Sequence, residues 1–563
     1  MSYLDKLNRF ASNPVSLDMK RSKFNRPYKR TTTMIAGKLW PIMCDEVLPG
    51  DTYNIDLSSL VRSITPAVPV MDEAFLDVFA FWVPARICTT HEHDWQKIHG
   101  ENFNSAWAPA NEATLQNTGN MVAFDELVPI RPNSLAANIG GLPIMEATFS
   151  NDSENIQVSV LPFIAYAKIW NEWFRDQNVQ APITDYFSFA SGAGNVASIL
   201  PTAKFHDYFT SALPAPQKGQ TVFLPLLGEA PIVTGEEHLT AANAVGMKEL
   251  MVRNSINQNR PVGTAFVSSS SGDQGELHST GSQPTISTNY GLVPSNLWAD
   301  LTAATSASVN QIRQAFAIQR LFERDARSGS RFREMLKAQY GVTIPDNTVQ
   351  VPEYLGGKRV PLNMQQVIQT SETGTTPLGS TGAFSNTFDS TKLCIKSFAE
   401  HGFLMVVATI RTTNTYSQGI HKMWTRNRRF DWYYPVFANL GEQAVKKMEL
   451  FLPNDNQGLE EGYKDIVFGY QEAWAEYRYK PSEVTGYFAP NAGDTILSSW
   501  TYTQFLSAIP TLNSDFIEEG RKKIDNTLVV NDSSYQFLCD FYFDMKCTRV
   551  MPYYSIPGLL DHH

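Results

Sequence analysis

The sequence predicts a mainly β protein, in which a multilayered β core carries several short helices as insertions. Three observations support this prediction. Residues 537–547 alternate between apolar and wetter positions, residues 403–410 are apolar at both parities, and Pro, Gly and Asn turn signals separate further strand-like segments. The βαβ repeats typical of a parallel sheet are not found.

The strand near the C-terminus has the clearest pattern. Gln536, Asp540, Asp544 and Lys546 occupy one parity, and the other parity is apolar: Phe537, Cys539, Phe541, Phe543, Met545 and Cys547. Successive side chains of a strand point to opposite faces. One face of this strand is therefore expected in the core and the other in contact with water.

The remaining strands are expected between the turn signals. Phe403–Ile410 is apolar on both parities, which is typical of a strand covered on both sides. Three further segments have strand character: Tyr53–Leu60, Ala74–Val83 and Asp465–Tyr479. The strand near the C-terminus is expected within Tyr535–Val550.

Helical spacing of apolar residues predicts three inserted helices. The residues with this spacing are Phe163, Tyr166, Trp170, Trp173 and Phe174 in the first, Val309, Ile312 and Phe316 in the second, and Phe332, Met335, Leu336 and Tyr340 in the third. Ser328, Gly329 and Ser330 are expected to separate the last two helices.

Charge is unevenly distributed along the chain. Residues 1–38 hold nine Lys or Arg and two acidic residues, Asp5 and Asp18, which gives a net charge of +7. Because the whole chain has a net charge of −10, residues 39–563 carry −17. Residues 1–38 contain Pro14 and Pro27 and no sustained period, and we interpret them as a basic extended N-terminal arm. A basic arm on an acidic body indicates a polyanion partner.

Composition excludes several classes of protein. With 43% hydrophobic and 18% charged residues the bulk of the chain is not disordered, and 12% aromatic residues suit a protein with many interfaces. The longest apolar run falls far short of the roughly 20 residues that span a bilayer, so no membrane insertion is expected. No secretory signal pattern is found, and folding in the cytoplasm is expected. Five cysteines without a CxxC pair predict reduced thiols.

Several long strings point to a family. They are EVLPGDT from Glu46, IWNEWFRDQN from Ile169, KFHDYFTSALPAPQKG from Lys204, FERDARSGSRF from Phe322, YYPVFANLGEQ from Tyr433, FGYQEAWAEYRYKP from Phe468 and YYSIPGLLDH from Tyr553. Together they resemble the major capsid proteins of gokushoviruses, which belong to the Microviridae.

The resemblance implies a fold and a function. The fold would be an eight-stranded viral jelly-roll β-sandwich with long loop insertions. Copies would form pentamers and assemble, in the cytoplasm of a bacterial host, into a T=1 icosahedral shell around a circular single-stranded DNA genome. Expected partners are this genome, a small basic DNA-packaging protein, scaffold proteins and a host surface receptor. The protein would be a structural part of the virion, with no enzymatic activity and no cofactor.

The resemblance also sets the expected domain boundaries. Beside the arm at residues 1–38, which composition already indicates, residues 39–227 with 297–563 would form a discontinuous capsid core with helical insertions. Residues 228–296 lie where the family carries a surface insertion that forms threefold protrusions. This stretch is rich in Ser, Gly and Thr, and exposed loops on a rigid scaffold often carry recognition, so we expect it to serve host attachment.

Two basic segments with interleaved aromatic residues are candidates for DNA binding, because single-stranded DNA offers phosphates and flat bases. The arm candidates are Lys20, Arg21, Lys23, Arg26, Lys29 and Arg30, beside Phe24 and Tyr28. The second set, in what we call the Lys422 segment (residues 422–434), is Lys422, Arg426, Arg428 and Arg429 with Trp424 and Trp432.

Both candidates have structural alternatives. The arm could bind acidic surfaces of neighbouring subunits, and the aromatic residues of the Lys422 segment could belong to the core or to a subunit contact. A third basic group, Arg313, Arg320, Arg324, Arg327, Arg331 and Arg333, is accompanied by acidic residues, which favours a solvated or interfacial helix face.

Catalytic and metal-binding patterns are weak. His91, His93, His99 and Asp94 could ligate a metal, but the glutamate that a cupin-type motif needs is missing, which favours a polar loop. Gly356–Arg359 departs from the phosphate-loop pattern at both ends.

Glu472 and Glu476 form a candidate acid/base pair. On one predicted strand they would stand about 13 Å apart on the same face, beyond glycosidase distances. Structural carboxylates paired with Arg478 or with a neighbouring subunit are therefore favoured. The alternative to a capsid function is a secreted carbohydrate-binding or glycan-hydrolysing β-sandwich protein, which a jelly-roll fold alone does not exclude.

Overall fold

The structure is a computed structural model. It describes residues 21–89, 95, 120–146, 156–191, 198–220, 222, 309–372, 374, 378–453, 462–489, 497–529 and 534–554, and strand segments 232–234, 251–254, 262–268, 276–279, 292–294 and 297–299. Two compact units are present, one formed by Met1–Lys218 with Arg324–His563 and the other by Gly219–Glu323.

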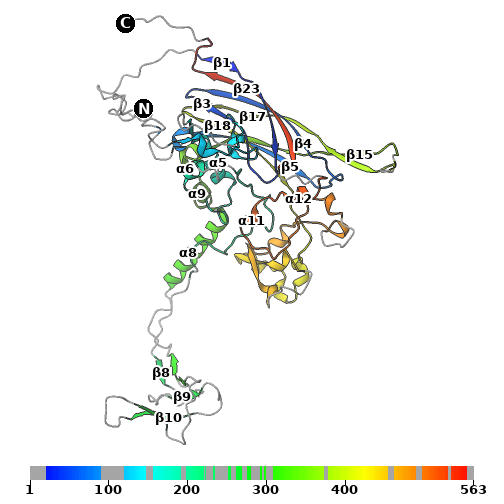
Figure 1. The fold of residues 1–563 in the computed structure, drawn as a ribbon. Coiled ribbons are helices and arrows are strands. Elements are labelled where there is room, and N and C mark those ends of the chain that lie inside the picture. Colours follow the sequence, from blue (N-terminus) through cyan, green and yellow to red (C-terminus); the bar gives the residue numbers. More distant parts are fainter. Residues whose placement is uncertain are drawn as a thin grey trace, which may run out of the picture. The chain divides into compact units, whose positions relative to one another are not determined.

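Two antiparallel sheets form the centre of the first unit (Figure 1). In the first sheet, β1 and β2 pair along one edge of β23, followed by β4 and β17. Its strands are β1 (Ser22–Asn25), β2 (Tyr28–Met34), β4 (Thr52–Ser63), β17 (Thr387–Ser397) and β23 (Phe537–Arg549). The second sheet has the order β14-β5-β18-β3. Its strands are β3 (Trp40–Val47), β5 (Ala74–Pro84), β14 (Glu353–Pro361) and β18 (Gly402–Thr412).

The two sheets share one hydrophobic core. From the first sheet, β4 contributes Tyr53 and Ile55 and β23 contributes Phe541 and Phe543. The second sheet faces them with alternate residues of β3, β5 and β18, such as Leu404. The alternation predicted for β23 is confirmed, since its odd-numbered residues from Phe537 to Cys547 are buried.

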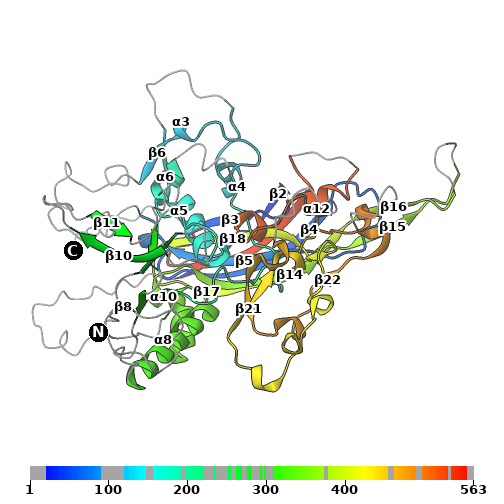
Figure 2. The ribbon, with the colours of Figure 1, turned by 90° about the horizontal axis from the view of Figure 1, so that it is seen from below.

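Helices cover the other face of the second sheet (Figure 2). They are α3 (Phe124–Leu127), α4 (Leu135–Ile139), α5 (Leu161–Ile169), which continues as a π-helix over Trp170–Phe174, and α6 (Tyr186–Ser191). Phe403, Met405 and Val407 of β18 pack against this layer, while alternate residues of the same strand face the other sheet. The prediction that β18 is covered on both sides is therefore confirmed.

The predicted helices are also confirmed. The first corresponds to α5 and its π-helical continuation, the second to α8 (Val309–Ser328) and the third to α9 (Phe332–Tyr340). Gly329 separates α8 from α9 with a φ of 94°, a left-handed conformation that favours glycine.

One predicted strand is wrong in its extent. Asp465–Tyr479 was expected to be a single strand, but β21 covers only Val467–Glu472, where it pairs with β20 (Glu442–Lys446). The chain turns at Trp474, whose φ is 66°, and Ala475–Tyr477 forms a 3₁₀ helix. The order of polar and apolar residues in this stretch does not indicate that turn.

The described part of the arm belongs to the sandwich. β1 and β2 extend the first sheet along β23, with a break at Arg26 and Pro27. Tyr28 stacks on the Phe543 ring of β23, with centroids 5.0 Å apart. The sequence of these residues showed no strand period because β2 carries Thr31, Thr32 and Thr33 where an apolar alternation would be expected.

The second unit holds short antiparallel strands. They are β8 (Ile232–Thr234), β9 (Met251–Asn254), β10 (Val262–Ser268), β11 (Glu276–Ser279), β12 (Leu292–Pro294) and β13 (Leu297–Ala299). β11, β10, β9 and β12 form one sheet, and β13 pairs with β8. The insertion expected at 228–296 lies within this unit.

The cysteine side chains are mostly buried. All five cysteines are free thiols, and burial raises the pKa of Cys88 to about 12. Among the helices that the structure describes, none is long and apolar enough to cross a membrane.

Candidate nucleic-acid interface

The Lys422 segment is a chain of short 3₁₀ turns held on a charged support. Its turns are Lys422–Thr425 and Arg429–Asp431, and a third, Pro435–Phe437, follows. The carboxylate of Asp431 accepts hydrogen bonds from the backbone N–H groups of Arg428 and Asn427, at 2.7 and 2.8 Å. These two bonds hold the pKa of Asp431 below its usual range.

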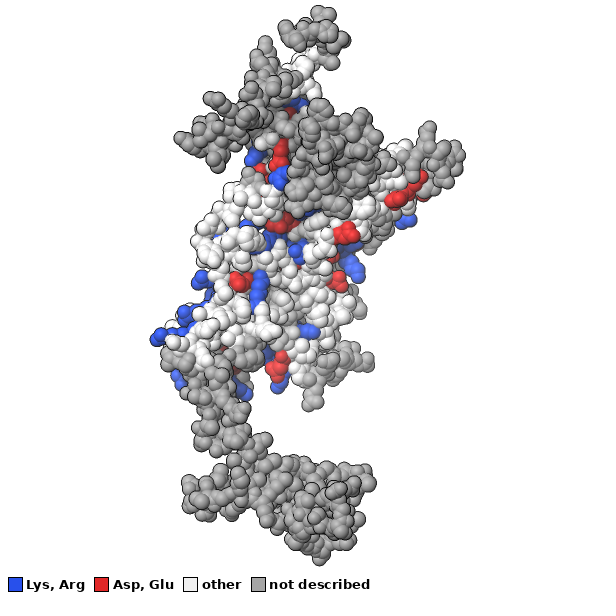
Figure 3. Space-filling model, turned by 90° about the vertical axis from the view of Figure 1, so that its left-hand side faces the viewer, with Lys and Arg blue, Asp and Glu red and all other residues white. Residues whose placement is uncertain are grey.

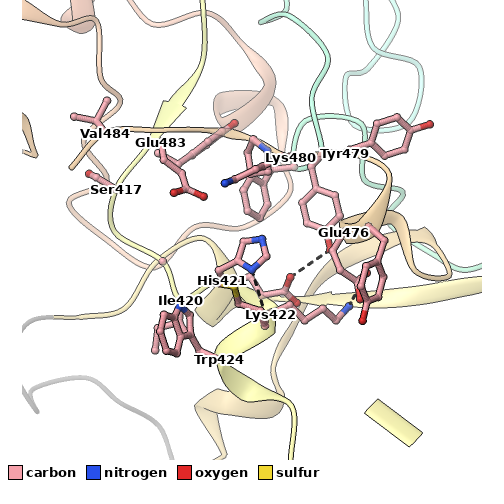
Figure 4. A pocket seen from close by; sticks show the side chains of 18 of the residues that line it. Ser417, Ile420, His421, Lys422, Trp424, Glu476, Tyr479, Lys480, Glu483 and Val484 are labelled. Atoms are coloured by element: carbon pink, nitrogen blue, oxygen red, sulfur yellow. Dashed lines mark hydrogen bonds and ion pairs between the residues drawn. The ribbon is translucent and has the colours of Figure 1, made fainter. Parts of the chain in front are cut away.

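Glu476 binds two cations of the Lys422 segment. Its carboxylate accepts a hydrogen bond from Arg426 at 2.9 Å. It also lies 3.7 Å from the Lys422 ammonium (Figure 4). Arg426 is 7% exposed and Glu476 6%, so this pair is shielded from water. The Arg426 guanidinium also lies over the Tyr477 ring, 4.4 Å from its centroid.

A cavity of about 860 Å³ adjoins this support (Figure 4). Its lining combines aromatic side chains such as Tyr416 and Trp424 with cations and carboxylates, among them Lys422 and Glu449. Burial raises the pKa of Glu449, whose carboxylate accepts a hydrogen bond from the Tyr208 hydroxyl at 3.3 Å. Sequence reasoning missed this cavity, because residues 208, 449 and 476 meet only in the folded chain.

The outer side of the Lys422 segment is open to solvent. Arg428 and Arg429 are exposed, and within the described ranges no carboxylate forms an ion pair with either. Trp424 is 76% exposed. The other large apolar side chains exposed here are Met423, Phe430, Trp432, Tyr433, Tyr434 and Val436. An exposed group of aromatic residues with unpaired cations can stack on bases and contact phosphates.

Three of the candidate cations in the arm are already bound by other groups of the fold. Arg26 binds Asp45 with two hydrogen bonds of 2.7 and 3.1 Å, and Lys29 pairs with Asp540 at 2.8 Å. Arg30 donates to the backbone carbonyl of Asn138, and burial lowers its pKa.

Two arm cations remain available. Arg21 and Lys23 are exposed and, over the part of the chain that can be described, lack an ion pair. Lys20 lies outside the described residues. The structure therefore brings the arm and the Lys422 segment into different surroundings and not into one site.

Other candidates can now be placed. His91, His93, His99 and Asp94 lie outside the described residues. Gly356 and Gly357 are part of β14, where a Cβ on Gly356 would lie 2.4 Å from the Leu393 carbonyl oxygen. These glycines permit close approach of two strands and form no phosphate loop.

The predicted carboxylate pair is separated by the turn at Trp474. Glu472 ends β21 and pairs with Arg478, as predicted, whereas Glu476 points to the Lys422 segment. The expectation that both lie on one strand face is wrong.

Among the helix arginines, Arg331 pairs with Glu334 and Arg333 with Asp346. Among the described residues on the face in Figure 3, basic and acidic side chains both occur.

Comparison with known proteins identifies the family. A family model described as "Capsid protein (F protein)" matches residues 12–559. The chain belongs to this capsid protein family.

Relatives agree over nearly the whole length. The chain is 36% identical to "Capsid protein VP1" of Bdellovibrio phage phiMH2K, covering 98% of this chain and 97% of the relative. It is 35% identical to the protein of the same name from Spiroplasma virus 4, with 96% and 95% covered, and 32% identical to that of Chlamydia phage 1, with 98% of each covered. This capsid protein is thus a structural protein of the virion of a Microviridae phage, and membership implies self-assembly into a shell.

Proposed function

We propose that this capsid protein closes into a T=1 icosahedral shell around a circular single-stranded DNA genome, with the exposed side of the Lys422 segment facing the DNA. The observation that carries the DNA contact is the exposure of Arg428 and Arg429 among protruding aromatic residues. Contacts of this kind track a backbone and stack on any base, which suits a shell that must accept a whole genome.

We infer that the sandwich is an eight-stranded jelly roll. Counting β1 and β2 as one interrupted strand, the sheets contain eight strand positions, and numbered along the chain they have the orders 1-8-3-6 and 2-7-4-5. The pairs 1·8, 2·7, 3·6 and 4·5 are those of one long antiparallel ribbon rolled into two sheets, which supports this topology. The helices from α3 to α9 and the second unit lie in the connection between positions 4 and 5.

The remaining partners are proposals from the family. Pentamers of the chain would assemble in the host cytoplasm with scaffold proteins and a small basic packaging protein. The insertion at 228–296 would contact a host surface receptor. Replacing it with a short linker should abolish adsorption of assembled particles to host cells, and unchanged adsorption would contradict this role.

The DNA contact can be tested with R428S/R429S. Removing two phosphate contacts should lower the slope of log affinity against log salt by about 1.4 for single-stranded DNA, since each contact contributes about 0.7. Titrating a labelled oligonucleotide with purified subunits at several salt concentrations measures this slope. A matched control, K464S/K522S, removes two exposed cations elsewhere and should leave the slope nearly unchanged. An equal slope for wild type and R428S/R429S would overturn the assignment.

A further inference from the structure

A two-stranded ribbon extends past the end of the sandwich. It is formed by β15 (Met364–Ile368) and β16 (Thr381–Ser385), and both Figure 1 and Figure 2 show it beyond the ends of β4 and β17. Pairing continues outward, where the Gln369 N–H donates to the Ser380 carbonyl at 2.8 Å. Six residues at about 3.3 Å each give a reach of about 20 Å.

The ribbon is tied to both sheets. β15 follows β14 of the second sheet, and β16 precedes β17 of the first sheet. At its base the Asn363 N–H donates to the Thr387 hydroxyl at 2.8 Å. In the part of the chain that the structure describes, neither β15 nor β16 pairs with a third strand, so both outer edges offer free backbone groups.

The ribbon carries uncovered apolar side chains on both faces. Ile368, 57% exposed, lies on one, and the other, called here its apolar face, is the one that continues onto the sandwich. The register places Gln365 opposite Phe384 and Val367 opposite Gly382, so that Val367 and Phe384 share a face. Val367 is 47% exposed and Phe384 45%. An isolated two-stranded hairpin is only marginally stable in water. Exposed edge strands usually carry charged side chains that prevent them from pairing with other chains. Residues 362–386 contain a single charged residue, Glu372.

The apolar face continues onto the sandwich. Phe388 of β17 is 70% exposed on the outer face of the first sheet, where Leu538 of β23 is also exposed. A groove of about 450 Å³ at the base of the ribbon is lined by residues that include Phe384, Leu538 and Arg62. Contiguous exposed apolar surface of this kind marks an interaction site.

We propose that this ribbon face, with the adjoining outer face of the first sheet, is a docking surface for a second copy of the chain. The ribbon has no cation for nucleic-acid phosphates or an anionic membrane, and its apolar face and free strand edges suit a protein partner. Capsid family membership implies that copies of the chain assemble into a shell, so that much of the surface of each copy faces other copies. The inference rests on the assembly in the proposed function and names one surface that makes it.

Thiol labelling of V367C tests the contact directly. Four of the five native cysteines are buried, so a maleimide should react mainly at position 367 in the unassembled subunit, with wild type as the background control. In assembled particles the labelling rate should fall at least tenfold. Particles can also be assembled from a mixture of isotopically light and heavy chains. Cross-links formed from the introduced thiol should then join a light copy to a heavy copy.

Charge substitutions give a matched comparison. V367E/F384E adds two charges to the apolar face and should raise the concentration needed for assembly at least tenfold, with little change in the unfolding temperature of the subunit. Q366E/T381E adds the same charge to the opposite face and should assemble like wild type.

Three outcomes overturn the inference. The introduced thiol could react as fast in particles as in subunits, its cross-links could join only positions within one chain, or V367E/F384E could assemble like wild type. Because labelling uses the nearly neutral V367C, it decides the question even where the charged variants fail to fold. A wild-type chain that stays monomeric under all assembly conditions would contradict the proposed function itself.

Discussion

The arm and the Lys422 segment each combine bound and exposed cations, but their aromatic side chains differ: Phe24 and Tyr28 of the arm stack on other rings of the fold, whereas several rings of the Lys422 segment are exposed. In the arm, Arg26 and Lys29 are bound by carboxylates, and Tyr28 stacks on Phe543. In the Lys422 segment, the fold binds Lys422 and Arg426, but Arg428, Arg429 and Trp424 stay open to solvent. Mixed cations and aromatic residues therefore do not identify a DNA site by themselves. The deciding property is whether the fold already supplies partners.

The largest effect is expected where a buried carboxylate holds two cations. Asp77 of β5 is 1% exposed and binds Arg359 at 2.6 Å as well as Arg411. Asp77→Ala should lower the free energy of unfolding by about 3–5 kcal/mol, because Arg411 would stay largely buried without its partner. Asp540→Ala, which removes the partner of the exposed Lys29, should cost less than about 1 kcal/mol. Urea unfolding measures both, and equal costs would break the comparison.

The next effect concerns a buried cation that is bound without a close carboxylate. Lys204 is 3% exposed, donates to the Phe516 carbonyl and has its pKa lowered to about 8, first by burial and then by Lys523. Between pH 8 and 10.5 the unfolded chain still binds a proton that the folded chain has lost, so stability rises with pH in this window. The decrease from 10.5 to about 8 corresponds to about 3 kcal/mol.

The measurement is the difference between wild type and Lys204→Met. Unfolding free energies at pH 7.5 to 10 should show a gain of wild type relative to the variant as pH rises. Other groups that titrate in this range are present in both chains and cancel in the difference. A difference that does not change with pH would show that Lys204 is not held neutral.

A smaller effect is expected for the exposed aromatic residues. Trp424→Ala should weaken binding of single-stranded DNA by about 1–3 kcal/mol, since one stacking contact with a base is lost. Its unfolding free energy should stay within about 0.5 kcal/mol of wild type, because the side chain is already exposed. Fluorescence anisotropy of a labelled oligonucleotide measures affinity. Tyr487→Ala, at another exposed aromatic residue, is the control and should bind like wild type.

The smallest effect compares two single arginines. Arg26→Ala removes two hydrogen bonds to Asp45 and should cost about 1 kcal/mol of stability, whereas Arg429→Ala should cost less than about 0.5 kcal/mol. Thermal unfolding of both variants at one pH is sufficient. A greater loss for Arg429→Ala would show that the fold also depends on the exposed side of the Lys422 segment.

Strands and helices were predicted where one physical signal dominates. The alternation in β23 and the continuous apolar run in β18 follow directly from burial on one side or both. The turn at Trp474 was missed, because a non-glycine residue in a left-handed conformation leaves no mark in the sequence. The strands of the arm were missed because β1 and β2 are held by pairing with β23, which lies about 510 residues later in the chain.

The sequence by itself determined the β framework, the family and the residue types able to contact DNA. Only the tertiary structure decided which of those residues are available. A cation's surroundings depend on carboxylates and carbonyls brought from distant parts of the chain, such as Asp540 beside Lys29 and Glu476 beside Arg426. Local patterns record which side chains avoid water, whereas the pairing of charges is set by how the strands and turns meet in space.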